Sequence, residues 1–167
     1  MRGLRMARRL AEMCATLCCG VFFGAAAYIS LAQQPAALET GAEFATRFFA
    51  PMYARASLMQ ASLAIGGTAA ALAAYLLGSG RLWLVTAALI LIVVPFTLFV
   101  VAPVNQQLKA VDPTDARALE VLIQWGRLHW FRTLASGLSF MLCLVGLGRW
   151  PASLFARTFR YAFFRRR

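Results

Sequence analysis

The sequence has few acidic residues and a single histidine. Its 167 residues include six Asp and Glu against 17 Lys and Arg, and His129 is the only imidazole. One histidine excludes two-histidine haem sites and histidine-rich zinc sites within a single copy of the chain. None of the six acids falls in the middle of a long apolar stretch, where a small drug or ion transporter usually places one. A transporter is therefore disfavoured.

Cysteine is also sparse, and its four copies lie within apolar runs, at positions 14, 18, 19 and 143. Thiols in such surroundings behave as small hydrophobic groups and do not form a disulfide framework. The sequence has no Cys-x-x-Cys spacing, so redox pairs and covalent haem find no support. Glycine-serine linkers are missing too, which leaves a single domain.

Apolar residues dominate the chain. They make up 61% of it, and the mean hydropathy is +0.68, whereas soluble domains are about 45–50% apolar. A transmembrane helix needs roughly 20 apolar residues. Four segments qualify, so the sequence predicts an all-α bundle of four transmembrane helices within a membrane domain at 11–149. The expected spans are about 11–32, 57–78, 82–104 and 130–147.

The order of the spans predicts a tight hairpin and a kink. Gly78-Ser79-Gly80 separates the second span from the third and is too short for anything but an antiparallel turn. Pro95 lies inside the third span, where it removes one backbone hydrogen bond. We therefore expect this helix to bend.

The positive charges indicate how the bundle is oriented. With four spans, the basic N-terminus at 1–10, the 78–81 turn and the C-terminal tail share one side, which carries 11 cations against Glu12 alone. The other side carries six cations against five acids. The positive-inside rule then predicts a multi-pass protein of the inner (plasma) membrane with both termini in the cytoplasm. Because these charges flank apolar runs, membrane lipids are the expected partner and nucleic acid is not.

Both ends of the chain leave alternatives open. The basic N-terminus, the first apolar run and Ser30-Leu31-Ala32 could form a cleavable signal, although the run is long for one. The tail at 150–167 alternates aromatic residues with arginines, which suits an interfacial anchor on anionic lipids or a disordered topology signal. Small residues in the second span permit close packing, either within one copy or in a homo-oligomer.

Two segments on the predicted outer side are longer than the inner turn. The mixed, aromatic stretch at 33–53 suits a re-entrant or interfacial element. The second segment predicts an extra amphipathic helix, with Asp112 as its N-cap and Pro113 at its first position. Running into the fourth span, it would be about 50 Å long, so its first part must protrude from the bilayer or lie along its surface.

Polar residues gather near the outer ends of three spans. Trp125, His129 and Arg132 are spaced four and three residues apart, which places them on one helical face. Asn105 and Thr97 share a side of the third span, and the second span contributes Tyr53, Ser57 and Gln60, with Arg55 nearby. These residues could be interfacial anchors. They could instead form a site in which neutral His129 acts as a base while Arg132 or Asn105 stabilises an oxyanion.

Several of these motifs resemble the anthrone oxygenase-like membrane family. The resemblance rests on Pro95-Phe96-Thr97, on the 102–108 stretch Ala-Pro-Val-Asn-Gln-Gln-Leu, on the Trp-x-x-x-His-x-x-Arg motif at 125–132 and on Tyr53-Ala54-Arg55-Ala56, and it covers roughly residues 15–148. It implies a four-helix membrane bundle. Fungal members are associated with the oxidation of anthrones to anthraquinones, without a metal or flavin.

The resemblance also implies a set of site residues. His129, Arg132 and Asn105 become the expected catalytic residues, and Trp125, Tyr53 and Arg55 the expected substrate-binding residues. No cofactor and no metal are expected, and the substrate would be a small apolar aromatic or polyketide-type molecule. The alternative function is non-catalytic, as an assembly factor or a subunit that binds lipid or a partner protein.

Overall fold

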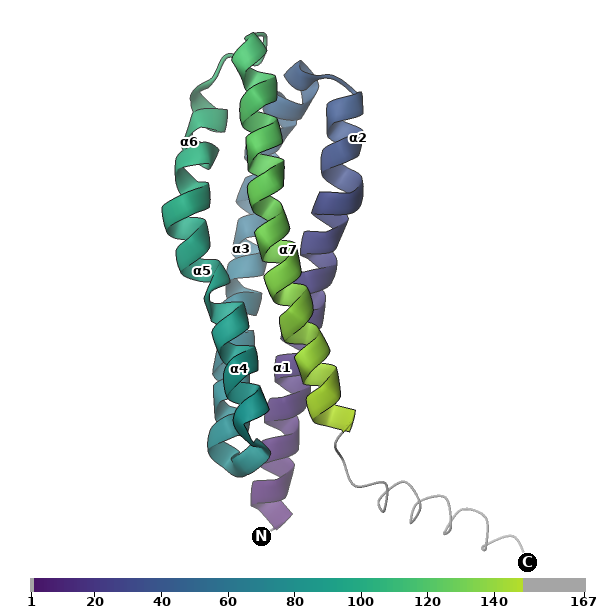
Figure 1. Cartoon of the computed structure of the whole chain (residues 1–167), viewed down its shortest axis with the longest axis vertical. Coiled ribbons are helices and arrows are strands. Elements are labelled where there is room, and N and C mark those ends of the chain that lie inside the picture. The colour runs from purple at the N-terminus through teal and green to yellow at the C-terminus, as the bar shows by residue number, and fades with distance from the viewer. Residues whose placement is uncertain (1, 149–167) are drawn as a thin grey trace, which may run out of the picture.

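The computed structural model describes residues 2–148, and these form a long helical bundle without strands (Figure 1). Four helical rods pack in a ring: the rod that contains α1 contacts those of α3 and α7, and α4 contacts the same two on the other side. The prediction of an all-α four-helix bundle is thus confirmed. The expected C-terminal anchor lies outside the described residues.

Each rod consists of one or more helices, and three rods contain a single π-helical turn. The first rod comprises α1 (Arg2–Tyr28), the π turn η1 (Ile29–Gln33) and α2 (Gln34–Glu39). The second comprises α3 (Ala42–Ala74) and η2 (Tyr75–Ser79). The third comprises α4 (Arg81–Leu91), α5 (Val93–Phe96), η3 (Thr97–Val101) and α6 (Ala102–Ala110), and the fourth is α7 (Ala116–Gly148).

All four rods are long and apolar enough to cross a membrane. They contain 38, 38, 30 and 33 residues, which corresponds to about 45–57 Å of helix against a hydrocarbon core of about 30 Å. The chain is therefore a multi-pass membrane protein whose bundle extends beyond the bilayer. The N-terminus, the turn at Gly78 and the end of α7 share one end of the bundle, called here the Gly78 end (Figure 1). Which side of the membrane this end faces stays a prediction.

Prolines explain why two of the rods are interrupted. A proline ring clashes with the carbonyl four residues earlier in an α-helix. Pro35 and Pro103 each follow a π turn, η1 and η3, which rearranges the backbone at that carbonyl. Pro95 coincides with the break between α4 and α5 at Ile92, as expected for the third span.

Glycines allow the two sharp turns between rods. Gly78 and Gly80 have φ values of 90° and 93°, and Gly41 has a φ of 117°, a region that side chains with a Cβ rarely enter. Gly41 ends a two-residue connection between α2 and α3. The segment at 33–53 thus forms two helix ends that meet at the opposite end of the bundle, the Gly41 end, and it is not a re-entrant loop. A position at the membrane interface stays a prediction.

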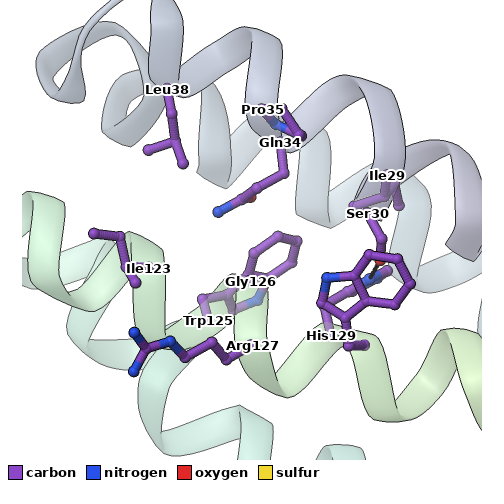
Figure 2. Close-up of a pocket in the computed structure, with 11 residues that line it drawn as sticks. Ile29, Ser30, Gln34, Pro35, Leu38, Ile123, Trp125, Gly126, Arg127 and His129 are labelled. Atoms are coloured by element: carbon purple, nitrogen blue, oxygen red, sulfur yellow. Dashed lines mark hydrogen bonds between the residues drawn. The ribbon is translucent and has the colours of Figure 1, made fainter.

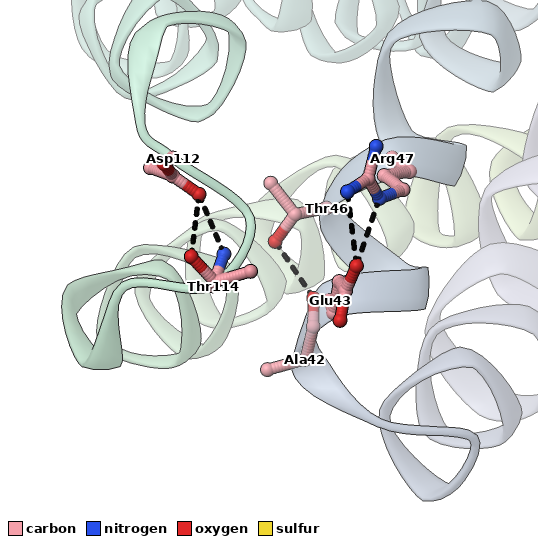
Figure 3. Close-up of polar contacts among 6 residues, drawn as sticks. All are labelled: Ala42, Glu43, Thr46, Arg47, Asp112 and Thr114. Carbon is pink, nitrogen blue, oxygen red and sulfur yellow. Dashed lines mark hydrogen bonds and ion pairs between the residues drawn. The ribbon is translucent and has the colours of Figure 1, made fainter.

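The Gly41 end also holds the connection from α6 to α7 (Figure 3). Asp112 accepts hydrogen bonds from the backbone N–H of Thr114 (2.9 Å) and from its hydroxyl (2.7 Å). These bonds, the backbone one above all, hold the pKa of the Asp112 carboxyl below its usual range. The helix start differs from the prediction: Asp115 accepts the backbone N–H of Arg117 at 2.8 Å and lies just before α7. The amphipathic segment and the fourth span nevertheless form one continuous helix, as expected.

The interior contains two apolar clusters with a band of polar side chains between them. One cluster, near the Gly78 end, includes Phe22, Trp83 and Ile90. The other, near the Gly41 end, includes Phe49 and Trp125. On each rod, the residues of the two clusters occupy separate stretches. The polar side chains between these stretches therefore have apolar side chains on both sides along the bundle.

Candidate functional site

The polar layer, as we call this band, consists of five residues from three rods: Ser30, Gln60, His129, Arg132 and Thr133. Four of them expose 5% of their surface or less. Arg132 lies 16 residues from either end of α7, about 24 Å of helix. Polar groups so far from water need partners within the protein or a ligand, because burying them alone is costly.

Arg132 and Gln60 form a buried pair at the centre of the layer. An Nη2 hydrogen of Arg132 is donated to Oε1 of Gln60, and the guanidinium carbon lies 5.7 Å from the centre of the Phe22 ring. Two donors remain: Nε of Arg132 and Nε2 of Gln60 are buried and have no hydrogen-bond partner. Nor does any carboxylate within residues 2–148 form an ion pair with Arg132.

The pair lines a cavity with a volume of about 540 Å³, called here the main cavity. This volume lies within the roughly 300–1,000 Å³ of typical ligand pockets. Its walls are mostly apolar and come from α1, α3, α5, η3 and α7. Leu58 and Leu98, which are 76% and 62% exposed, border it on the outer surface of the bundle. The remaining residues that line it are Phe22, Tyr53, Ala54, Ser57, Ala61, Ala64, Val93, Val94 and Thr97.

His129 is held by a chain of hydroxyl groups. Its Nδ1 lies 3.0 Å from Oγ of Ser30, which lies 2.9 Å from Oγ1 of Thr133, and Thr133 donates to the carbonyl of Ala26 at 3.2 Å. Each hydroxyl has one hydrogen to donate. If Thr133 gives its hydrogen to the carbonyl, Ser30 donates to Thr133 and must accept from His129. The proton of the neutral imidazole then resides on Nδ1, which leaves Nε2 as the basic nitrogen.

His129 lines a second pocket, which lies between the first rod and α7 and has a volume of about 270 Å³ (Figure 2). Figure 2 shows Ser30 and Gln34 reaching across from the first rod to Trp125 and His129 on α7. Gln34 donates to the carbonyl of Leu122 at 2.9 Å. A Cβ on Gly126 would lie 3.0 Å from Nε2 of Gln34, so the glycine makes this approach possible.

Aromatic rings connect the second pocket with the Gly41 end of the bundle. The ring of Trp125 lies 5.0 Å from that of His129 and 5.2 Å from that of Phe49, and Phe49 stacks on Tyr53 at 5.5 Å. The indole Nε1 of Trp125 donates to Oδ1 of Asn105 at 2.9 Å. Asn105 therefore fixes the orientation of Trp125.

The structure brings together most, but not all, of the site residues predicted from the sequence. His129, Arg132, Asn105 and Trp125 are all buried, and Tyr53 lines the main cavity. However, Asn105 is bound to Trp125, and His129 and Arg132 line different cavities. Arg55 does not join the site: it is exposed, and its guanidinium is directed to the carbonyl of Pro51 in its own helix.

Sequence reasoning missed the importance of two residues. The sequence places the polar Gln60 on the same helix face as Tyr53 and Ser57, but it does not identify Gln60 as the partner of Arg132. Ser30 belongs to the possible cleavage signal, and nothing in its local sequence indicates a contact with His129, 99 residues away. Within the described residues, no group of three His, Cys, Asp or Glu could hold a metal ion.

Comparison with known proteins gives one match. The family model described as anthrone oxygenase matches residues 49–142, which is more than half of the chain. No curated protein and no solved structure matches. The matched region includes α7 as far as Leu142 and most of the lining of the main cavity, and it ends beyond Arg132.

Proposed function

The chain belongs to the anthrone oxygenase family, and we propose that it is a membrane-embedded oxygenase that oxidises a small aromatic substrate with oxygen and without a cofactor. The observation that carries the proposal is the main cavity, in which a buried arginine and glutamine meet apolar walls. Pockets of this composition fix a ligand through a few polar groups and bury the rest of it. The cavity borders the lipid-facing surface, so both an apolar aromatic molecule and oxygen can reach it from the bilayer.

The proposed reaction needs only a base and a group that stabilises negative charge. Removal of one proton from a CH2 group that lies between two aromatic rings and is conjugated through them with a ketone gives a delocalised carbanion. The carbanion adds to oxygen and forms a C–O bond, and a returning proton completes a hydroperoxide. Loss of water breaks the O–O bond and the remaining C–H bond and leaves a second carbonyl. The substrate carbon supplies all four electrons that reduce oxygen, so no external reductant is required.

Each role in this proposal falls to a residue of the polar layer. Arg132 and Gln60 hold the substrate oxygen, where the charge of the carbanion collects. His129 takes the proton through Nε2. Because His129 lines the second pocket and not the main cavity, the proton passes to it through a bridging water molecule. Ser30 and Thr133 are positioning residues, because they fix the imidazole, and Asn105 positions Trp125.

The test is oxygen consumption by the purified protein in lipid nanodiscs with anthrone as substrate, with the quinone product followed by its absorbance. We expect His129→Gln and Arg132→Gln each to lower the rate roughly 100-fold or more. Arg117→Gln is the matched control, because Arg117 lies exposed on the same helix, and its rate should equal that of the wild type. A wild-type rate no higher than that of empty nanodiscs, or an unchanged rate for His129→Gln, would refute the proposal.

A further inference from the structure

The interior contains a buried positive charge, on Arg132, that has no negatively charged partner among the described residues. Arg132 is 5% exposed, and all six acids of the sequence lie elsewhere, at Glu12, Glu39, Glu43, Asp112, Asp115 and Glu120. Removing a charge from water costs free energy that an opposite charge or a full set of hydrogen bonds must offset. Gln60 supplies a neutral acceptor for one hydrogen of the guanidinium, and that leaves the charge itself uncompensated.

The unused donors of this pair indicate what would complete it. Nε of Arg132 and Nε2 of Gln60 are both buried without a partner, and both residues line the main cavity. A molecule in the cavity can thus accept one hydrogen bond from each of the two residues. Both are donors, so they require acceptors, and the adjacent charge favours an acceptor that is ionised.

We propose that the main cavity binds its substrate as a preformed anion, an aromatic molecule with one ionised oxygen group held by Arg132 and Gln60. Carboxylate and phenolate share this chemistry. The inference rests on the proposed function, because it takes the cavity to be the substrate site. It adds that the site prefers a substrate that is already negatively charged when it binds, and does not only stabilise charge that develops during the reaction. The role of His129 as a base also becomes smaller, which fits its place in the other pocket. An ionised substrate already carries part of the electron density that reacts with oxygen.

The lining of the cavity limits the ligand further. Apart from Arg132 and Gln60, its polar groups come from Tyr53, Ser57 and Thr97, and the hydroxyl of Thr97 is already bound to the carbonyl of Val93 at 2.7 Å. The hydroxyl of Ser57 likewise donates to the carbonyl of Ala54, at 3.3 Å, so the lining favours a ligand whose remaining surface is mainly apolar. One charged end and a large apolar body are the features of an aromatic acid or acidic phenol that partitions into a membrane.

The experiment measures equilibrium binding to the protein in nanodiscs of neutral lipid, so that the lipid charge does not interfere. The probes are 2-naphthoate and 2-naphthamide, which have nearly the same shape and differ in charge. We expect wild-type protein to bind naphthoate roughly tenfold more tightly or better, and Arg132→Gln to abolish the preference. Equal affinity for the two probes, or a preference that survives in Arg132→Gln, would overturn the inference.

Gln60→Glu gives a second variant that does not depend on removing the arginine. It places a carboxylate of the same size against Arg132 and so supplies an internal counter-ion. We expect this variant to be at least as heat-stable as the wild type and to lose its preference for naphthoate. Undiminished naphthoate binding by a folded Gln60→Glu protein would contradict the inference.

Two further comparisons separate the inference from the proposed function. His129→Gln should keep the full preference for naphthoate while losing oxygenase activity. If the wild type shows the preference but no oxygen consumption, the anion site stands and the oxygenase proposal fails. Dodecanoate tests the source of the anion: tighter binding than naphthoate would retain the anion site but assign it to a fatty acid, against the aromatic substrate proposed above.

Discussion

His129 can be observed without ambiguity, because it is the only histidine in the chain. The hydroxyl chain through Ser30 and Thr133 implies that its neutral form carries the proton on Nδ1. The protein labelled with 15N-histidine, after removal of any affinity tag, should give one pair of ring signals with the shifts of that tautomer. Signals of the Nε2-protonated form would contradict the hydrogen-bond direction derived above.

Ser30→Ala tests whether the hydroxyl chain matters for activity. It removes the acceptor for Nδ1, so the tautomer should shift towards protonation at Nε2, which lowers the fraction of His129 able to act as a base. We expect a fall in the oxygenase rate together with this spectral change. Ser62→Ala is the control, because its hydroxyl is exposed and bonds only within α3. A loss of activity without any change in the 15N signals would mean that Ser30 acts in another way.

Asn105 and Trp125 should behave as one unit. Asn105→Leu leaves the buried indole N–H without an acceptor, at a cost of about 1–3 kcal/mol, whereas Trp125→Phe removes donor and ring together. In a double-mutant cycle of unfolding in detergent, the two substitutions should therefore be non-additive. Additive effects would show that the 2.9 Å hydrogen bond contributes little to stability.

At the scale of the helices, α1 and α7 interlock through two reciprocal contacts. Phe23 of α1 packs over Gly137 of α7, and Phe140 of α7 packs over Gly20 of α1. A Cβ at these glycines would lie 2.9 and 2.8 Å from the ring carbons, closer than van der Waals contact allows. The rings also stack on each other, with centroids 6.3 Å apart. This contact holds α7 at a fixed distance from the first rod, next to the polar layer.

Alanine at either glycine should push the two helices apart. We expect Gly20→Ala and Gly137→Ala to destabilise the protein by roughly 1–3 kcal/mol, measured by thermal unfolding in detergent. Gly24→Ala is the matched control, because nothing lies within 4 Å of a Cβ there, and it should be neutral or stabilising by up to about 1 kcal/mol. Equal effects at the three sites would argue against the interlock.

The sequence predicted the number of helices better than their ends. Hydropathy detects the part of a helix that crosses the bilayer, so it located four spans. It gave no signal for α2 or the start of α3, because a helix that continues into water has no reason to be uniformly apolar. Helical periodicity likewise grouped Tyr53, Ser57 and Gln60 on one face correctly. Arg55, five residues before Gln60, falls about 140° away from it around the helix, and this explains why it is exposed.

The contacts between helices could not be predicted in the same way. Periodicity places Trp125, His129 and Arg132 on one side of α7, but His129 and Arg132 still differ by about 60° around the axis. That difference is enough to direct them to separate cavities. Whether Ser30 and Gln60 reach these residues depends on how the first rod and α3 are rotated in the bundle, which a single sequence does not specify.

At the scale of the whole molecule, orientation in the membrane is open to a direct test. The excess of cations at the Gly78 end predicts that the Gly41 end faces outwards. Thr114→Cys, at the exposed α6–α7 connection, should react with a membrane-impermeant maleimide on intact cells, in a background where Cys14 and Cys18 are serine. Gly3→Cys should react only after the cells are permeabilised. The reverse pattern would invert the topology.

The position of the main cavity beside Leu58 and Leu98 has a kinetic consequence. For a substrate that enters from the lipid, the rate depends on its mole fraction in the bilayer and not on its molar concentration in the buffer. Added empty vesicles should therefore slow the reaction at constant total substrate, by surface dilution. Added buffer at a constant ratio of substrate to lipid should leave the turnover per protein unchanged. If the proposed oxygenase activity holds, the apparent KM will therefore depend on the amount of lipid as well as on the protein.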